Sequence, residues 1–308
     1  MSPPPPSGPV VVGVDGSDGS RAALAFATEE ARRRDAPLHL LHALAWPLGG
    51  TAAELPPDVR LRTAVEQGAQ TLLTTAAGGA TDVLGTDRVS WSVADGDPVG
   101  ILNAASAEAQ LLVLGSRGVG GVAGLLLGST ATAVVTRAVC PVVVLPDPTA
   151  VVVSPRTAVV VGVEGRPGDE AVLAFAFGEA AARGTGLVAV HAWQDAILET
   201  SFPSMSPLVD WAGVLLDEER VLAEALAGWR EKKPDVAVRE VLLRERTARA
   251  LVSVALTAEL LVVGHRHRGP LARLGSTTHG VLHRAGCPVA VVPVPGGGAA
   301  AVAGGSSG

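Results

Sequence analysis

An internal repeat constrains the fold of this chain more than any other feature of its sequence. The segment Val10–Gly16 reads Val-Val-Val-Gly-Val-Asp-Gly, and 149 residues later Val159–Gly165 reads Val-Val-Val-Gly-Val-Glu-Gly. The same spacing of 149 residues relates Leu111–Gly115 to Leu260–Gly264. A constant spacing between several matching blocks predicts a duplicated domain rather than one long fold.

The domain limits follow from this repeat. A length of 308 residues suits two domains of ordinary size, and a Pro-interrupted stretch around residues 146–156 separates the copies. We therefore predict one domain over residues 9–147 and a second over residues 156–295. Residues 1–8, rich in proline, predict a disordered arm. Residues 296–308, composed of small residues, predict a flexible tail.

Within each copy, short apolar runs alternate with segments of helix-forming residues. In the first copy the predicted strands are 10–14, 38–43, 88–93, 111–114 and 142–145, and the predicted helices are 20–34, 58–77, 98–107 and 129–137. This alternation predicts an α/β fold with a doubly wound parallel sheet in each copy. Such sheets bind ligands beyond the carboxyl ends of the strands, where the winding reverses. We therefore expect the chemistry after the first and fourth strands.

Charge and hydropathy exclude several classes of partner. The net charge of −6 argues against nucleic acid, whose phosphates need clustered Lys and Arg. No apolar run approaches the roughly 18 residues that span a bilayer, and the N-terminus lacks the apolar segment of a signal peptide. We expect a cytoplasmic protein without a membrane partner. Its two cysteines, Cys140 and Cys287, occupy matching positions in the two copies, which favours reduced core residues over a disulfide.

A glycine-rich loop follows the predicted fourth strand. Gly115–Gly121 reads Gly-Ser-Arg-Gly-Val-Gly-Gly, and Gly128-Ser129-Thr130 opens the next predicted helix. Glycines let backbone N–H groups approach an anion, and a helix N-terminus attracts one. Together they predict a phosphate cradle. The alternative is a flexible loop in which Ser129 is only an N-cap.

The spacing of this loop resembles a known signature. Gly115, Gly118, Gly128 and Ser129 fit G-x2-G-x9-G-[ST], as in ATP-binding universal stress proteins. The resemblance extends to Val-Gly-Val-Asp-Gly-Ser at the first strand, to Leu-His-Ala at the second and to Cys-Pro-Val-Val-Val at the fifth. It covers both copies. It implies an adenine nucleotide alpha hydrolase-like fold with strand order 3-2-1-4-5, and ATP, with or without Mg²⁺, as the ligand.

The resemblance also implies roles for particular residues. Asp15 would contact the nucleoside, with Gly13 lining the same pocket and Ala43 touching the adenine. The loop and the following helix start would bind the phosphates through Gly115, Ser116, Arg117, Gly118, Val119, Gly120, Gly121, Gly128, Ser129 and Thr130. Two of these residues have alternative roles. Asp15 is also a turn-forming residue, and Arg117 is also a solvated loop arginine.

The second copy departs from the pattern. Glu164 replaces Asp15, His267 aligns with Gly118, and the interval from Gly264 to Gly275 is two residues shorter than its counterpart. One interpretation is a degenerate half without ATP. The other is a site reshaped for another anion by Arg266, Arg268 and the neighbouring histidines. His279 and His283 share a helix face without an evident third ligand, so we predict no metal site.

The sequence offers no machinery for rapid catalysis. The loop has no lysine, no P-loop motif occurs, and no general base stands beside the cradle. We expect a regulatory stress protein whose conformation or assembly depends on bound ATP. The alternatives are a slow ATP hydrolase, and a nucleotide-independent scaffold for an unknown partner protein. The resemblance implies a homodimer, or pairing of the two copies through their fifth strands.

Overall fold

The computed structural model describes residues 8–45, 59–119, 127–147, 157–194, 210–266 and 274–294, so most of the predicted arm and all of the tail lie outside it. None of the helices in these ranges is both long and apolar enough to cross a membrane. The chain divides into two compact units. The first comprises Met1–Val153 with Leu282–Val291, and the second comprises Ser154–Val281 with Val292–Gly308. The domain limits drawn from the repeat stay a prediction.

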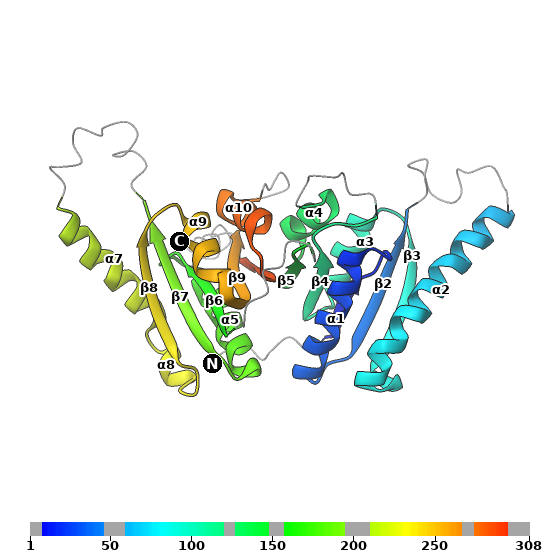
Figure 1. The fold of residues 1–308 in the computed structure, drawn as a ribbon, viewed down its shortest axis with the longest axis horizontal. Coiled ribbons are helices and arrows are strands. Elements are labelled where there is room, and N and C mark those ends of the chain that lie inside the picture. The colour runs from blue at the N-terminus through cyan, green and yellow to red at the C-terminus, as the bar shows by residue number, and fades with distance from the viewer. Residues whose placement is uncertain are drawn as a thin grey trace, which may run out of the picture. The chain divides into compact units, whose positions relative to one another are not determined.

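The first unit contains the predicted sheet, with strand order β3-β2-β1-β4-β5. All neighbours in this order pair in parallel. The strands are β1 (Val10–Gly13), β2 (Leu38–Leu44), β3 (Val89–Asp95), β4 (Leu111–Gly115) and β5 (Val142–Leu145). The order 3-2-1-4-5 is therefore confirmed (Figure 1). At its far edge, β5 pairs antiparallel with Val289–Val291, the part of β10 (Val289–Val294) that groups with this unit.

Two pairs of helices accompany this sheet. α1 packs with α2 and α3 with α4, as expected for the two faces of a doubly wound sheet. Their bounds are α1 (Asp18–Arg33), α2 (Val59–Leu84), α3 (Pro98–Ala105) and α4 (Ser129–Arg137), and a short 3₁₀ turn, η1, spans Thr86–Arg88.

Helix α2 is longer than the predicted helix 58–77. It continues through Gly78 and Gly79 and ends at Leu84. Its buried residues recur at helical spacing, ending with Ala77, Ala80 and Leu84. Burial of this stripe offsets the cost of two glycines, roughly 1 kcal/mol each in a helix interior.

The second unit repeats the arrangement. Its strands lie in the order β9-β6-β7-β8, which correspond to β4, β1, β2 and β3 of the first copy. The bounds are β6 (Ala158–Val163), β7 (Gly186–Trp193), β8 (Val238–Arg244) and β9 (Ala258–Arg266). Its helices are α5 (Asp169–Arg183), α7 (Trp211–Leu226), α8 (Trp229–Lys232), α9 (Thr247–Val254) and α10 (Ser276–Arg284), with a 3₁₀ turn, η4, at Ala255–Thr257.

Aliphatic side chains fill both cores. The central strands are apolar on both faces because helices cover both, so Val10, Val12 and Val113 are fully buried. Both cysteines are buried and neither forms a disulfide, which confirms the expected core role. Burial raises the pKa of the Cys140 thiol to about 12, so this thiol stays protonated.

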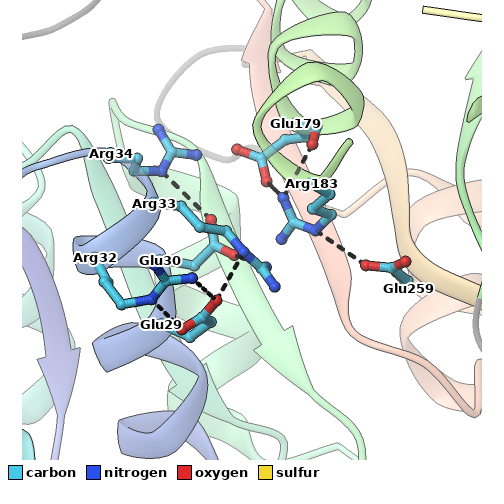
Figure 2. A network of polar contacts seen from close by, with 8 residues as sticks. All are labelled: Glu29, Glu30, Arg32, Arg33, Arg34, Glu179, Arg183 and Glu259. Atoms are coloured by element: carbon cyan, nitrogen blue, oxygen red, sulfur yellow. Dashed lines mark hydrogen bonds and ion pairs between the residues drawn. The ribbon is translucent and has the colours of Figure 1, made fainter. Parts of the chain in front are cut away.

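A buried ion pair recurs at the end of the first helix of each copy (Figure 2). In α1, Glu30 is 1% exposed and lies 3.2 Å from Arg33 and 3.4 Å from Arg34. In α5, Glu179 pairs with Arg183, and Arg183 also lies 3.8 Å from Glu259. The pairs Glu30–Arg34 and Glu179–Arg183 are 149 residues apart, so the duplication kept this interaction.

The two pairs differ in the exposure of the arginine, and this predicts unequal stability effects. Glu179→Gln is expected to cost about 3 kcal/mol of unfolding free energy, because the side chain of Arg183 is only 1% exposed. Glu30→Gln should cost less, since the side chain of Arg34 is 18% exposed and can turn toward water. Urea unfolding of the two variants at neutral pH measures the difference. Equal losses would contradict this account.

Candidate functional site

The candidate site lies where the winding of the first sheet reverses. Strand β1 pairs with β2 on one side and with β4 on the other, so the carboxyl ends of β1 and β4 are neighbours. Segments of the chain that are distant in sequence approach closely here. A Cβ at Gly115 would lie 2.6 Å from the backbone of Gly19, and a Cβ at Gly13 would lie 2.8 Å from Leu114. Glycine is required at Gly115 because a backbone cannot yield as a flexible side chain does.

A cavity of about 570 Å³ opens at this edge. It brings together the predicted residues of the first strand, the second strand, the loop and the helix start. Those that line it are Gly13, Asp15, Ala43, Gly115, Ser116, Arg117, Gly118, Val119, Gly128, Ser129 and Thr130. The predicted Gly120 and Gly121 lie outside the described residues.

Asp15 connects the end of β1 to the loop after β4. Its Oδ1 accepts hydrogen bonds from the Ser17 N–H at 3.0 Å and from the Ser17 hydroxyl at 2.6 Å. Its Oδ2 accepts one from the Val119 N–H at 3.0 Å, across 104 residues of sequence. Asp15 thus forms the Asx turn that was its alternative role, and it also joins two walls of the cavity.

These hydrogen bonds set the protonation state of Asp15. Burial raises the pKa of the carboxyl, but the hydrogen bonds from Ser17 and Val119 outweigh it and hold the pKa below its ordinary value. The carboxylate is therefore charged at neutral pH, at the position where the nucleoside is expected.

The same carboxylate leaves no room for a side chain at Gly118. A Cβ built at this position would lie 2.3 Å from Asp15 Oδ2. Any other residue must displace either the carboxylate or the loop. The sequence predicted a glycine for close approach of a ligand, and the structure adds a contact with the protein's own side chain.

Arg117 is not the solvated loop arginine of its alternative role, and its expected contact with phosphates stays a prediction. Its guanidinium forms an ion pair with Asp147, which follows β5, and the Arg117 side chain is 33% exposed. The residue lines the cavity, but its charge is directed to Asp147 rather than to solvent.

The start of α4 supplies the opposite wall. Gly128 is the N-cap, without a side-chain hydrogen bond, and its own N–H donates to the Ser116 carbonyl at 2.7 Å. Ser129 is the first helical residue and is exposed, so the alternative of Ser129 as N-cap is wrong. Because Gly128 has no side chain, the N-cap residue provides no side-chain acceptor for the first N–H groups of α4 at the cavity edge.

The sequence analysis missed several lining residues. They are Val14, Ser20, Leu41, His42, Pro98, Leu102, Leu114, Leu127 and Ala131. Among them, His42 donates its Nδ1–H to the Val14 carbonyl at 2.6 Å. Most of the others are apolar and carry no motif. Their positions near the strand ends or near the starts of α1, α3 and α4 were the available signal.

The equivalent cavity in the second copy is smaller, and the residues that line it form different hydrogen bonds and ion pairs. Its cavity is about 320 Å³. Glu164, the counterpart of Asp15, forms an ion pair at 3.1 Å with Arg266, the counterpart of Arg117. Asp169 Oδ2 accepts hydrogen bonds from the backbone N–H groups of Glu164, Gly165 and Arg166. These groups are thus bound within the protein, and His267 and Arg268 lie outside the described residues.

His191, the counterpart of His42, is buried and more constrained. Its Nδ1 lies 2.8 Å from the Val163 carbonyl, and its Nε2 lies 2.7 Å from Glu218 of α7. Across the part of the chain that the structure describes, no group of three His, Cys, Asp or Glu residues could hold a metal ion.

Comparison with known proteins identifies the family. A sequence profile described as the Universal stress protein family matches residues 7–146 and again residues 155–293. The chain belongs to the universal stress protein family. Universal stress protein Rv2005c of Mycobacterium tuberculosis is 39% identical over 302 residues, with 94% of this chain and 99% of that protein covered. Universal stress protein Rv2623 of the same species is 37% identical over 289 residues, with coverage of 92% and 95%.

The fold has solved counterparts. The crystal structure of a universal stress protein from Archaeoglobus fulgidus DSM 4304 matches with a TM-score of 0.66. It covers 94% of this chain and 97% of that chain at 20% sequence identity. The family membership and the tandem organisation predicted from the repeat are therefore confirmed.

The bonding of Asp15 predicts a pH-dependent stability effect. Asp15→Asn places an amide N–H against one of the donors and is expected to cost about 1 kcal/mol of unfolding free energy at neutral pH. A carboxyl with a lowered folded pKa stabilises above its unfolded pKa, about 3.9, and this stabilisation is lost as pH falls through the folded value. The variant and the wild type should therefore converge in acid, as urea unfolding at both pH values would measure.

Glu164→Gln is the matched control for Asp15→Asn. Its side chain is 53% exposed, so the loss should stay below about 0.5 kcal/mol at any pH. A larger cost for Glu164→Gln than for Asp15→Asn would contradict the role assigned to Asp15.

Proposed function

We propose that the first copy of this universal stress protein binds ATP, with or without Mg²⁺, in the cavity around Asp15. One observation carries the proposal: an ionised carboxylate and a helix N-terminus whose N-cap residue, Gly128, has no side chain line the same cavity. The carboxylate suits hydroxyl or amine donors of a nucleoside, and the helix start suits phosphate oxygens. A cavity of about 570 Å³ falls in the usual range for sites that bind small molecules and cofactors.

The placement of the remaining residues supports the same ligand. Ala43, near the end of β2, lines the cavity together with the apolar Leu41 and Leu102, which offers a surface for a purine ring. Gly115, Gly118 and Gly128 lie toward the helix start, where backbone N–H groups can approach phosphates. The G-x2-G-x9-G-[ST] spacing resembles the ATP-binding members of the family and points to the same assignment.

The proposed role is regulation by binding rather than turnover. Asp15 is the one carboxylate among the described residues that line the cavity, and it accepts three hydrogen bonds from Ser17 and Val119. A general base needs a free acceptor near the attacking water. We infer that the protein is cytoplasmic. We also infer that the conformation of the loop after β4 responds to ATP, because a nucleoside that hydrogen-bonds to Asp15 would compete with the Val119 N–H for the same carboxylate.

The second copy is proposed to be a degenerate partner. The pairing of Glu164 with Arg266 neutralises the carboxylate that would face a nucleoside. The three N–H groups bound by Asp169 are unavailable to a ligand. The smaller cavity, about 320 Å³, fits the same conclusion.

Calorimetric titration of Mg²⁺-ATP into nucleotide-stripped protein tests this function. The expected stoichiometry is one ATP per chain. Gly118→Ala should weaken binding by roughly tenfold or more, because its Cβ would lie 2.3 Å from the Asp15 carboxylate and displace it. Adding Gly128→Ala, whose Cβ would lie 3.2 Å from the Ser116 carbonyl, should weaken binding further.

Gly275→Ala is the matched control. Gly275 is the counterpart of Gly128, and a Cβ there would meet no atom of the described residues within 4 Å. This variant should bind like the wild type. Two ATP molecules per chain would contradict the degenerate assignment of the second copy, and no binding would favour the nucleotide-independent scaffold.

A further inference from the structure

The two edge strands β3 and β8 occupy equivalent positions but carry different chemistry. Each pairs in parallel with one neighbour, β3 with β2 and β8 with β7, in a register without interruption over seven residues. Both follow the same burial pattern along the strand, with the second, third and seventh residues exposed. The duplication thus gives two edges of one geometry, and their side chains can be compared position by position.

The β8 edge is protected by charge. Its three exposed residues are Arg239, Glu240 and Arg244, and Glu240 forms an ion pair at 2.5 Å with Arg230 of α8. Charged side chains are a common device that keeps an unpaired strand edge from adding another strand. Nothing on this edge favours a partner.

The β3 edge lacks this protection. Its exposed residues are Ser90, Trp91 and Asp95, so the centre of the strand carries no charge. Trp91, the counterpart of Glu240, is 40% exposed. The strand contains no proline and no bulge, and among the described residues it pairs only with β2. A long, regular edge whose centre is uncharged is a template for pairing with another strand.

The sequence of β3 identifies the strand that fits this edge. Val89-Ser90-Trp91-Ser92-Val93 reads the same in both directions. An antiparallel pair about a two-fold axis at Trp91 would therefore place Trp91 opposite Trp91, serine opposite serine, and valine opposite valine. A two-fold interface requires this self-complementarity. We propose that β3 is a docking edge for the β3 strand of a second copy of this chain, in antiparallel register centred on Trp91.

The side chains around β3 are compatible with such a pair. Val93 packs against Leu44 and Ala69, so Trp91, two residues away, lies on the face that α2 covers. The two indole rings would meet on that face as a cross-strand aromatic pair. On the opposite face the Ser90 and Ser92 hydroxyls lie 2.9 and 2.8 Å from the ring nitrogens of His39. Side chains this small leave room for a partner strand.

The first test replaces Trp91 of β3 with glutamate, the residue found at the matching position, Glu240, of the charged β8 edge. Trp91→Glu places two like charges directly opposite each other and should weaken self-association by roughly tenfold or more. Sedimentation equilibrium over a range of protein concentrations would show a reversible dimer for the wild type and a monomer for the variant. Glu240→Gln, at the matched position of β8, should leave the dimer unchanged.

A second variant measures the register directly. Trp91→Cys brings two thiols within disulfide reach in a pair centred on this residue, whereas Glu240→Cys should not cross-link. Background from the native cysteines is low, since Cys140 and Cys287 are both buried. Rapid formation of a covalent dimer by Trp91→Cys alone is the expected result. A wild type that stays monomeric, a dimer that survives Trp91→Glu, or equal cross-linking of both cysteine variants would overturn the proposal.

Discussion

Parallel pairing of β1 with both β2 and β4 is the constraint on which the first copy depends. It brings the ends of strands that are about a hundred residues apart in sequence to one edge of the sheet. The backbone segments then approach so closely that there is no space for a side chain at Gly19 or at Gly115. Asp15 completes the arrangement, because its carboxylate ties the end of β1 to the loop after β4.

The duplication allows the two copies to be compared with each other, because they share one backbone arrangement and differ in their side chains. Both copies keep a buried glutamate–arginine pair and a histidine bonded to the carbonyl that ends the first strand. They differ at the cavity, where Arg117 bonds to Asp147 but Arg266 bonds to Glu164. The copies have retained the interactions that hold the fold and have diverged where a ligand or a partner would bind.

The sequence predicted the architecture well because apolar strands and helices leave local patterns. The repeat and the alternation of elements predicted two doubly wound α/β copies, whereas the strand order and the family came from the resemblance carried by the loop spacing and the strand motifs. The interactions of the site were harder to predict. That Gly118 faces Asp15, and that Arg117 turns to Asp147, depends on where the loop and the segment after β5 lie in space. The length of α2 was also misjudged, since burial of Ala80 and Leu84 outweighs a Gly-Gly pair.

The central claim is that the two copies have the same fold but only the first holds a nucleotide. Hydrogen exchange of the full chain with and without Mg²⁺-ATP, resolved by peptide, tests it most directly. The account predicts slower exchange in Gly115–Val119 and in Gly128–Ala131 when ATP is present, with no change in the matched segments Gly264–Arg266 and Gly275–Thr278. Protection of the second-copy segments, or of neither pair, would contradict it.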